Sequence, residues 1–220
     1  MEDLNEYLAP TRTIESDSRP IVEKARQLTA SHPRAEDKAV SLFYFVRDQI
    51  KYTMYVQITR EEDYKATTTL ARGNGYCGHK AVLMTALARA AGIPARLKFA
   101  DLENHKLPQK YIEMQGTNLT VYHGFLELYL NGRWLTVDPA YDRVMCAKNR
   151  LIPVEFDGEH DATLHPLDLD GKPDTTCVRT HGPFRDLPHT DIIRATKEAY
   201  GQDFFETWGQ HAKDTTPPTS

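Results

Sequence analysis

Cysteine is scarce in this chain, which has three among 220 residues, at positions 77, 146 and 177. An odd and thinly spread set of this size does not build the disulfide framework that small secreted domains use. We therefore expect free thiols in a reducing compartment, which favours the cytoplasm. In such a compartment a cysteine can be retained for its reactivity.

An excess of positive charge and long apolar runs are also missing. The 27 lysines and arginines are outnumbered by 31 aspartates and glutamates, for a formal net charge of −4, and no segment gathers basic side chains into a stripe. This balance argues against nucleic acid as a partner. No apolar run approaches the roughly 20 residues of a membrane span, and the acidic N-terminus is not followed by an apolar segment. We expect a soluble, unexported protein that binds neither nucleic acid nor membranes.

The chain does have enough apolar material for a sizeable core, with 40% hydrophobic and 10% aromatic residues. Because it contains no internal repeat and no clear linker, we predict a single domain over residues 1–220. An N-terminal helix is expected at 18–30, a core at about 35–142 and a loop-rich extension at 143–210. The tail at 212–220 is expected to be disordered.

The spacing of apolar residues predicts a helix followed by a sheet. Residues 78–91 are apolar almost all round, which is typical of a buried central helix that ends at Gly92 and Pro94. After Pro94 the apolar period changes to two, and an Asn131-Gly132 turn predicts a hairpin. The predicted strands are 95–100, 121–130 and 133–137, and residues 101–118 are predicted to be a surface loop. The fold class is therefore α+β, with a buried helix on an antiparallel sheet.

Cys77 lies at the start of the predicted central helix, behind the glycines at 73 and 75. Unpaired N–H groups and the helix dipole favour negative charge there, so a thiol at such a place loses its proton more readily and becomes a better nucleophile. Its backbone N–H would also face the oxygen of an acyl group under attack, as half of an oxyanion hole. A buried, inert core cysteine is the alternative interpretation.

His123 and Asp138 supply the groups that such a thiol needs. They lie fifteen residues apart, on the two strands that the Asn131-Gly132 turn joins, and a hairpin brings such positions within cross-strand reach. A carboxylate at Asp138 can fix the tautomer of the imidazole, and the imidazole can take the proton of the thiol. The sequence thus contains the parts of a Cys-His-Asp triad.

Three stretches carry a resemblance to a known family. They are 73–81 (GNGYCGHKA) with 87–96 (LARAAGIPAR), then 122–129 (YHGFLELY), then 132–139 (GRWLTVDP). Their order and local context resemble the cysteine, histidine and aspartate blocks of the transglutaminase-like superfamily, and the chain is similar to a small, single-domain member of bacterial type. The resemblance implies a papain-like core with Cys77 as nucleophile, His123 as base and acid, and Asp138 as the orienting carboxylate.

The chain also departs from the enzymes that crosslink proteins. Those enzymes carry a tryptophan directly after the cysteine, flanking domains and calcium sites, whereas Gly78 follows Cys77 here and no acidic calcium loop is present. We therefore do not expect a calcium-dependent crosslinker, and we expect neither a cofactor nor a metal. A zinc site built from His160, His165, Cys177 and His181 is disfavoured by its spacing.

Several other side chains are candidates for a second oxyanion donor or for substrate contacts. Tyr52, Tyr55, Gln57 and Tyr76 precede or adjoin the nucleophile, although a tyrosine-rich segment beside a core also serves packing. His79 is expected to face solvent or to bond a loop rather than to act in catalysis. His105, in the predicted loop, either touches substrate or is simply exposed.

The function that these residues predict is cysteine-dependent chemistry on an acyl group. Hydrolysis of an amide, peptide or isopeptide bond is favoured, because no feature for binding an amine acceptor is evident. One alternative is an acyltransferase that forms an amide or cleaves or transfers a thioester in a small-molecule pathway. Another is a non-catalytic binding module with the same fold, against which the survival of all three triad residue types speaks. The substrate and the oligomeric state are left undetermined.

Overall fold

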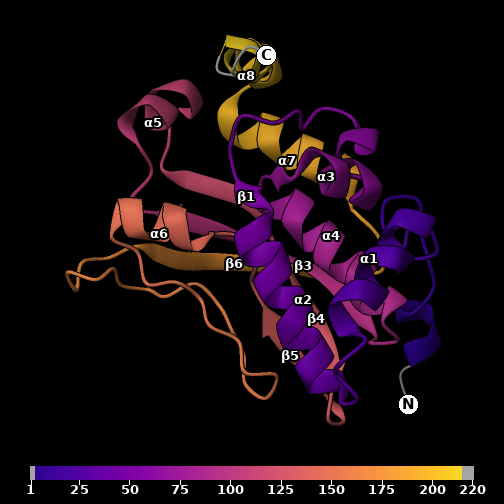
Figure 1. The fold of residues 1–220 in the computed structure, drawn as a ribbon. Coiled ribbons are helices and arrows are strands. Elements are labelled where there is room, and N and C mark those ends of the chain that lie inside the picture. Colours follow the sequence, from indigo (N-terminus) through magenta and orange to yellow (C-terminus); the bar gives the residue numbers. More distant parts are fainter. Residues whose placement is uncertain (1–2, 215–220) are drawn as a thin grey trace.

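The computed structural model describes residues 3–214, with side chains as far as Gly209. Four strands form an antiparallel sheet in the order β5-β4-β3-β6 (Figure 1), and two short strands, β1 and β2, pair in parallel as a separate sheet. The strands are β1 (Lys51–Tyr52), β2 (Asn74–Gly75), β3 (Ala95–Asn104), β4 (Leu119–Leu130), β5 (Arg133–Val137) and β6 (Thr175–Phe184).

Helices cover one face of this sheet, with α4 at the centre. Helix α4 contacts β3 and β4 on one side and α1, α2 and α3 on the other (Figure 1). The α-helices are α1 (Arg19–Thr29), α2 (Ala35–Gln49), α3 (Ala66–Arg72), α4 (Cys77–Ala90), α5 (Gln109–Gln115), α6 (Arg143–Asn149), α7 (His189–Tyr200) and α8 (Phe204–Asp214). Two short 3-10 helices, η1 (Leu4–Tyr7) and η2 (Glu61–Tyr64), complete the set. None of the helices in the described part of the chain combines the length and the apolar character of a membrane span.

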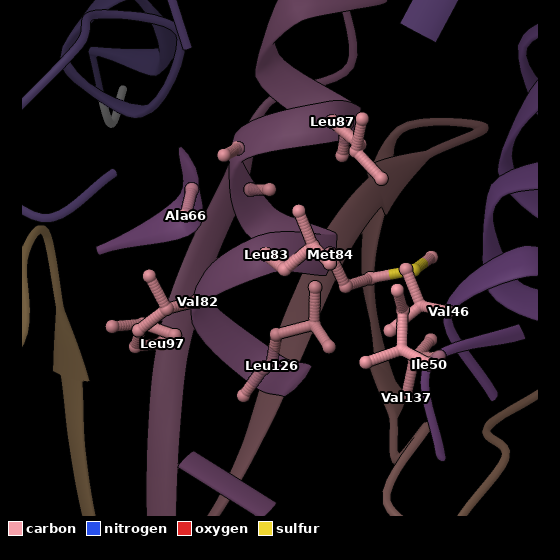
Figure 2. Close-up of a cluster of buried hydrophobic side chains, with 14 of the residues drawn as sticks. Val46, Ile50, Ala66, Val82, Leu83, Met84, Leu87, Leu97, Leu126 and Val137 are labelled. Atoms are coloured by element: carbon pink, nitrogen blue, oxygen red, sulfur yellow. The ribbon is translucent and has the colours of Figure 1, made fainter. Parts of the chain in front are cut away.

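The core is built around α4, in which every residue from Cys77 to Arg89 is buried. Figure 2 shows the apolar side chains gathered there, with Val46 and Ile50 from the α2 side and Leu97 and Leu126 from the sheet. Each such side chain contributes roughly 1.5–3 kcal/mol when it is fully removed from water. The absence of a polar face, which predicted a buried central helix, is thus explained, and the predicted fold class is confirmed.

The β4–β5 hairpin forms at the predicted turn. Asn131 and Gly132 have φ values of 52° and 79°, the left-handed conformation that a two-residue hairpin turn requires. Leu130 pairs with Arg133 and Leu126 with Val137, so the strand that carries His123 lies beside the strand that ends at Asp138.

Elsewhere the structure is more regular than the sequence analysis expected. The predicted loop at 101–118 contains the end of β3 and the helix α5, and the extension at 143–210 contains α6, β6 and α7. Strand β6 escaped detection because it is an edge strand whose side chains are mostly exposed, which leaves no apolar alternation. The tail predicted from 212 is wrong for residues 212–214, which belong to α8, and 215–220 lie outside the described residues.

Candidate active site

Cys77 is the first residue of α4, as the sequence analysis expected. The preceding residue, Tyr76, is extended at φ −82° and ψ 169° and provides no side-chain cap, so the first N–H groups of the helix are directed toward the region of the thiol. The thiol itself is completely buried, in a cluster with Ala140, Tyr141, Cys146 and Leu151. Cys77 is therefore not open to solvent at the mouth of the helix but covered by neighbouring side chains.

His123 and Asp138 form a buried pair on the adjacent strands. Nε2 of His123 lies 2.7 Å from Oδ2 of Asp138, and both side chains are 4% exposed. The other carboxylate oxygen accepts the N–H of Ala140 at 2.9 Å, which fixes the orientation of Asp138. Because Nε2 is occupied by Asp138, Nδ1 is the ring nitrogen left for the hydrogen bond between His123 and Cys77. The structure thus brings together the three residues that the sequence predicted.

The charge state of His123 follows from its neighbours. Burial opposes the charged ring, but the Asp138 carboxylate, the negative charge of Cys77 and the hydrogen bonds to both outweigh burial and raise the pKa of His123 well above its ordinary value. The imidazole is therefore held as a cation between two groups that carry or develop negative charge. A charged imidazole beside a cysteine is an arrangement found where a cysteine acts as a nucleophile.

The close approach of helix and sheet depends on two glycines. A Cβ on Gly124, the residue after His123, would lie 2.7 Å from the Cα of Gly78, the residue after Cys77. No side chain larger than hydrogen fits between these backbones. Gly78, which distinguishes this chain from crosslinking enzymes in sequence, is thus the surface on which the His123 strand rests.

A cleft of about 490 Å³ leads to His123 and to the side chains that cover Cys77. Its walls come from the segment after α2, the β3–α5 connection and α6, which stand around the same side of the molecule (Figure 1). Five tyrosines line it: Tyr52, Tyr55, Tyr76, Tyr111 and Tyr141. A second groove, of about 350 Å³, is lined by His123 and Asp138 together with side chains of β3 and β6 that do not line the cleft. His123 therefore lines both hollows.

Tyr141 belongs to the cluster that buries Cys77, and Tyr52 and Tyr76 pack against that cluster. The rings of Tyr52 and Tyr141 meet edge to face with centroids 4.9 Å apart. Burial and the negative charge of Cys77 raise the pKa of both phenols, so they keep their protons at neutral pH. Tyr141 was missed in the sequence analysis, although its place three residues after Asp138 would have indicated it.

The other candidates have different surroundings. Tyr76 lines the cleft, and the hydroxyl of Tyr55, also on its wall, accepts a hydrogen bond from Lys110. The backbone oxygen of Gln57 lies 3.2 Å from Nε2 of His79. His105 is exposed and bonds Thr176 at 3.1 Å.

Of the two expectations for His79, that it faces solvent or bonds a loop, the first is wrong. It is completely buried and stacks on Tyr64, with ring centroids 4.3 Å apart, so it does not face solvent. Its hydrogen bond to the loop at Gln57 is the alternative that was expected. Burial, together with the charge of Arg72, lowers the pKa of His79 to about 3, so the ring is neutral.

The residues of the disfavoured zinc site are engaged elsewhere. His181 bonds Asp101 at 2.9 Å and His160 bonds Asp157 at 2.7 Å. Within residues 3–214 we find no group of three or more His, Cys, Asp or Glu side chains placed to hold a metal ion.

The chain is similar to one protein family and to several solved structures. The model of the transglutaminase-like superfamily matches residues 22–139, a range that includes Cys77, His123 and Asp138. Among solved structures, a candidate cysteine protease from Cytophaga hutchinsonii is 17% identical, with a TM-score of 0.49 over 84% of this chain. The periplasmic domain of TgpA from Pseudomonas aeruginosa is 24% identical, with a TM-score of 0.44 over 66% of this chain. This chain covers 59% and 48% of those two proteins, respectively. No curated protein matches the sequence.

Proposed function

The chain belongs to the transglutaminase-like superfamily, and from that premise we propose that it is a cysteine-dependent hydrolase of amide, peptide or isopeptide bonds. The observation that carries the proposal is the buried chain of contacts from Asp138 through His123 to Cys77. A core cysteine kept only for packing has no need of a charged histidine whose own partner is a buried carboxylate.

The proposed reaction has two halves. The Cys77 thiolate attacks the acyl carbonyl, and the His123 imidazolium gives its proton to the leaving amine as the C–N bond breaks. In the second half His123 takes a proton from water, the hydroxide equivalent attacks the thioester, and the S–acyl bond breaks to restore the thiolate–imidazolium pair. Asp138 keeps the His123 ring in one tautomer and one orientation through both halves.

The oxygen of the acyl group needs donors while it carries negative charge. The backbone N–H of Cys77 is one, because it belongs to the unpaired first turn of α4. The protonated phenols of Tyr52 and Tyr141, which line the cleft and pack in or against the cluster around Cys77, are the donors that we propose for the second.

We propose a peptide or a small amide or thioester as the substrate class, since the cleft of about 490 Å³ is of a size for such a group. Acyl transfer to an amine is the second candidate, favoured by the second groove that His123 lines, which would let an acceptor approach while the acyl group fills the cleft. A binding module of the same fold is the non-catalytic alternative. The organisation of the chain as a single domain and its location in the cytoplasm remain predictions from the sequence.

A screen with mixed fluorogenic peptides and small amides tests the proposal. We expect turnover that Cys77→Ala abolishes and that Cys146→Ala, a substitution of another buried cysteine, retains. Adding a primary amine during turnover separates hydrolysis from transfer, because transfer yields a new amide. A Cys77→Ala variant with the turnover of the wild-type protein would refute the nucleophile. Wild-type protein that turns over no probe and whose Cys77 forms no adduct with an acyl-directed thiol reagent near neutral pH would favour the binding module.

A further inference from the structure

Strand β4 is irregular immediately before His123. Ala100 of β3 pairs with His123, but two residues later Leu102 pairs with Thr120, so three steps on β4 oppose two on β3. The extra residue forms a β-bulge. Tyr122 in this bulge has φ 51°, a left-handed conformation that bulky side chains rarely adopt. The residue that precedes the proposed base is therefore held in a strained backbone conformation.

Two side chains take over the hydrogen bonds that the bulge removes from the sheet. The Asp101 carboxylate accepts the N–H of Tyr122 at 3.0 Å. The Tyr200 hydroxyl accepts the N–H of Val121 at 2.8 Å and donates to the carbonyl of Leu119 at 2.9 Å. A buried backbone group without a partner is costly, so these contacts stabilise the bulge in this one shape.

Asp101 is itself fixed from the edge of the sheet. Arg179 and His181, both on β6, bond its carboxylate at 2.8 and 2.9 Å. Burial opposes the charge of Asp101, but the Tyr122 N–H, His181 and Arg179 outweigh burial and lower the pKa of the carboxyl. The ring of His181 also stacks on that of Tyr122, with centroids 4.2 Å apart. One ionised carboxylate thus joins three strands beside the site.

We propose that Asp101 and Tyr200, the bulge clamp, are positioning residues that set the direction of the His123 ring. The proposal rests on the proposed roles of His123 and Asp138. It also gives the extension after residue 139 a purpose, because β6 and α7, which supply Arg179, His181 and Tyr200, lie beyond the part of the chain that the family model matches.

The reason is geometric. His123 must hold Asp138 with one nitrogen and face Cys77 with the other, so a small rotation of its backbone weakens both contacts at once. Without the clamp, Tyr122 would relax toward an extended conformation. That relaxation would turn the following residue, His123, away from its present direction.

The experiment compares Tyr200→Phe with Tyr44→Phe. Tyr44 is the control because its hydroxyl also bonds a backbone carbonyl and N–H, those of Phe156, in addition to the Glu155 carboxylate at 2.8 Å. The titration of His123 is followed by NMR of the ring nitrogens, with its signals among the nine histidines assigned by their loss in His123→Gln. The labelling of Cys77 by iodoacetamide at pH 6 is followed by peptide-resolved mass spectrometry.

We expect the pKa of His123 to fall toward its ordinary value in Tyr200→Phe, and the labelling of Cys77 to slow by about tenfold, because less thiolate is held. Tyr44→Phe should leave both unchanged. Asp101→Ala should act like Tyr200→Phe. Asp101→Asn keeps an oxygen for the Tyr122 N–H, so its His123 pKa and Cys77 labelling rate should lie between those of Asp101→Ala and the wild-type protein.

A folded Tyr200→Phe protein with the His123 titration of the wild-type protein would overturn the proposal, even if its thermal stability had dropped. If Asp101→Ala does not fold, Tyr200→Phe decides, since it removes a single oxygen atom. None of these readouts needs a substrate. Failure of the clamp is therefore distinguishable from failure of the proposed hydrolase, which Cys77→Ala tests by turnover.

Discussion

Gly124→Ala adds a single methyl group at the tightest approach between α4 and the sheet. The new Cβ would lie 2.7 Å from the Cα and 3.0 Å from the nitrogen of Gly78. Since ordinary contacts begin at 3.4 Å, the helix and the strand must separate by about 3.4 − 2.7 = 0.7 Å. Both partners are backbone, so no side-chain rotation relieves the contact. The separation falls on the two residues that follow Cys77 and His123.

The expected magnitudes follow from this displacement. Overpacking of this kind costs about 1–3 kcal/mol of stability, which for a chain of this length lowers the melting temperature by about 2–12 °C. Activity should suffer more, because a misplacement approaching 1 Å between reacting groups costs about 10²-fold. The labelling of Cys77 by iodoacetamide at pH 6 should slow as well, because the thiol moves away from His123 and less thiolate is held.

Two other glycines give a graded series for the same assays. A Cβ on Gly78 would meet a carbon of the Tyr64 ring at 3.2 Å, so Gly78→Ala should be intermediate. Gly209, in α8, has nothing within 4 Å, so Gly209→Ala should match the wild-type protein. Turnover in Gly124→Ala equal to that in Gly209→Ala would refute the argument that this close approach aligns the site.

Two further predictions concern charge. Asp138→Asn removes the carboxylate whose charge and hydrogen bond help to raise the pKa of His123 against the effect of burial, so the alkaline loss of activity in a pH–rate profile should move to lower pH; superimposed profiles would contradict this. In the wild-type protein the charged His123 ring contributes its full stabilisation below about pH 6.5. This stabilisation is lost as the pH rises through the raised pKa of His123 in the folded protein. Lys80→Met removes a buried amine whose pKa burial lowers to about 7, and which donates to the carbonyl of Arg47 at 2.9 Å. Because the unfolded chain binds the extra proton up to about 10.5, wild-type stability should gain up to about 1.4 kcal/mol per pH unit from Lys80 above pH 7. Urea unfolding at pH 7 and 9 should show a flatter dependence in the variant, and parallel slopes would contradict the assignment.

The parts of the site that the sequence predicted are those with local signals. A run without a polar face predicted α4, and the Asn131-Gly132 turn fixed the register that brings the strand of His123 beside Asp138. The resemblance to the transglutaminase-like superfamily rests on the sequence segments around Cys77, His123 and Asp138. The hairpin relates His123 to Asp138 directly, whereas the place of Cys77 beside them was expected from the resemblance to the family.

The parts that escaped prediction depend on contacts between distant segments. No residue type marks the bulge, because its left-handed position is taken by Tyr122 rather than by glycine. The partners that stabilise it, Asp101 and Tyr200, lie 21 and 79 residues from the groups that they bond. The burial of Cys77 likewise depends on side chains that are distant in the sequence, since Tyr52 precedes it by 25 residues and Tyr141 follows it by 64.

The complete burial of Cys77 has a consequence for redox chemistry. A thiolate is the form of cysteine that peroxide attacks, and susceptibility follows both thiolate character and exposure. In the resting protein the sulfur lies behind Tyr52 and Tyr141, whereas Cys177 is exposed on β6. Peroxide should therefore oxidise Cys177 first. Cys77 should be oxidised more slowly, at a rate set by how often Tyr52 and Tyr141 move aside. The rate of inactivation by peroxide would therefore measure the frequency of that motion.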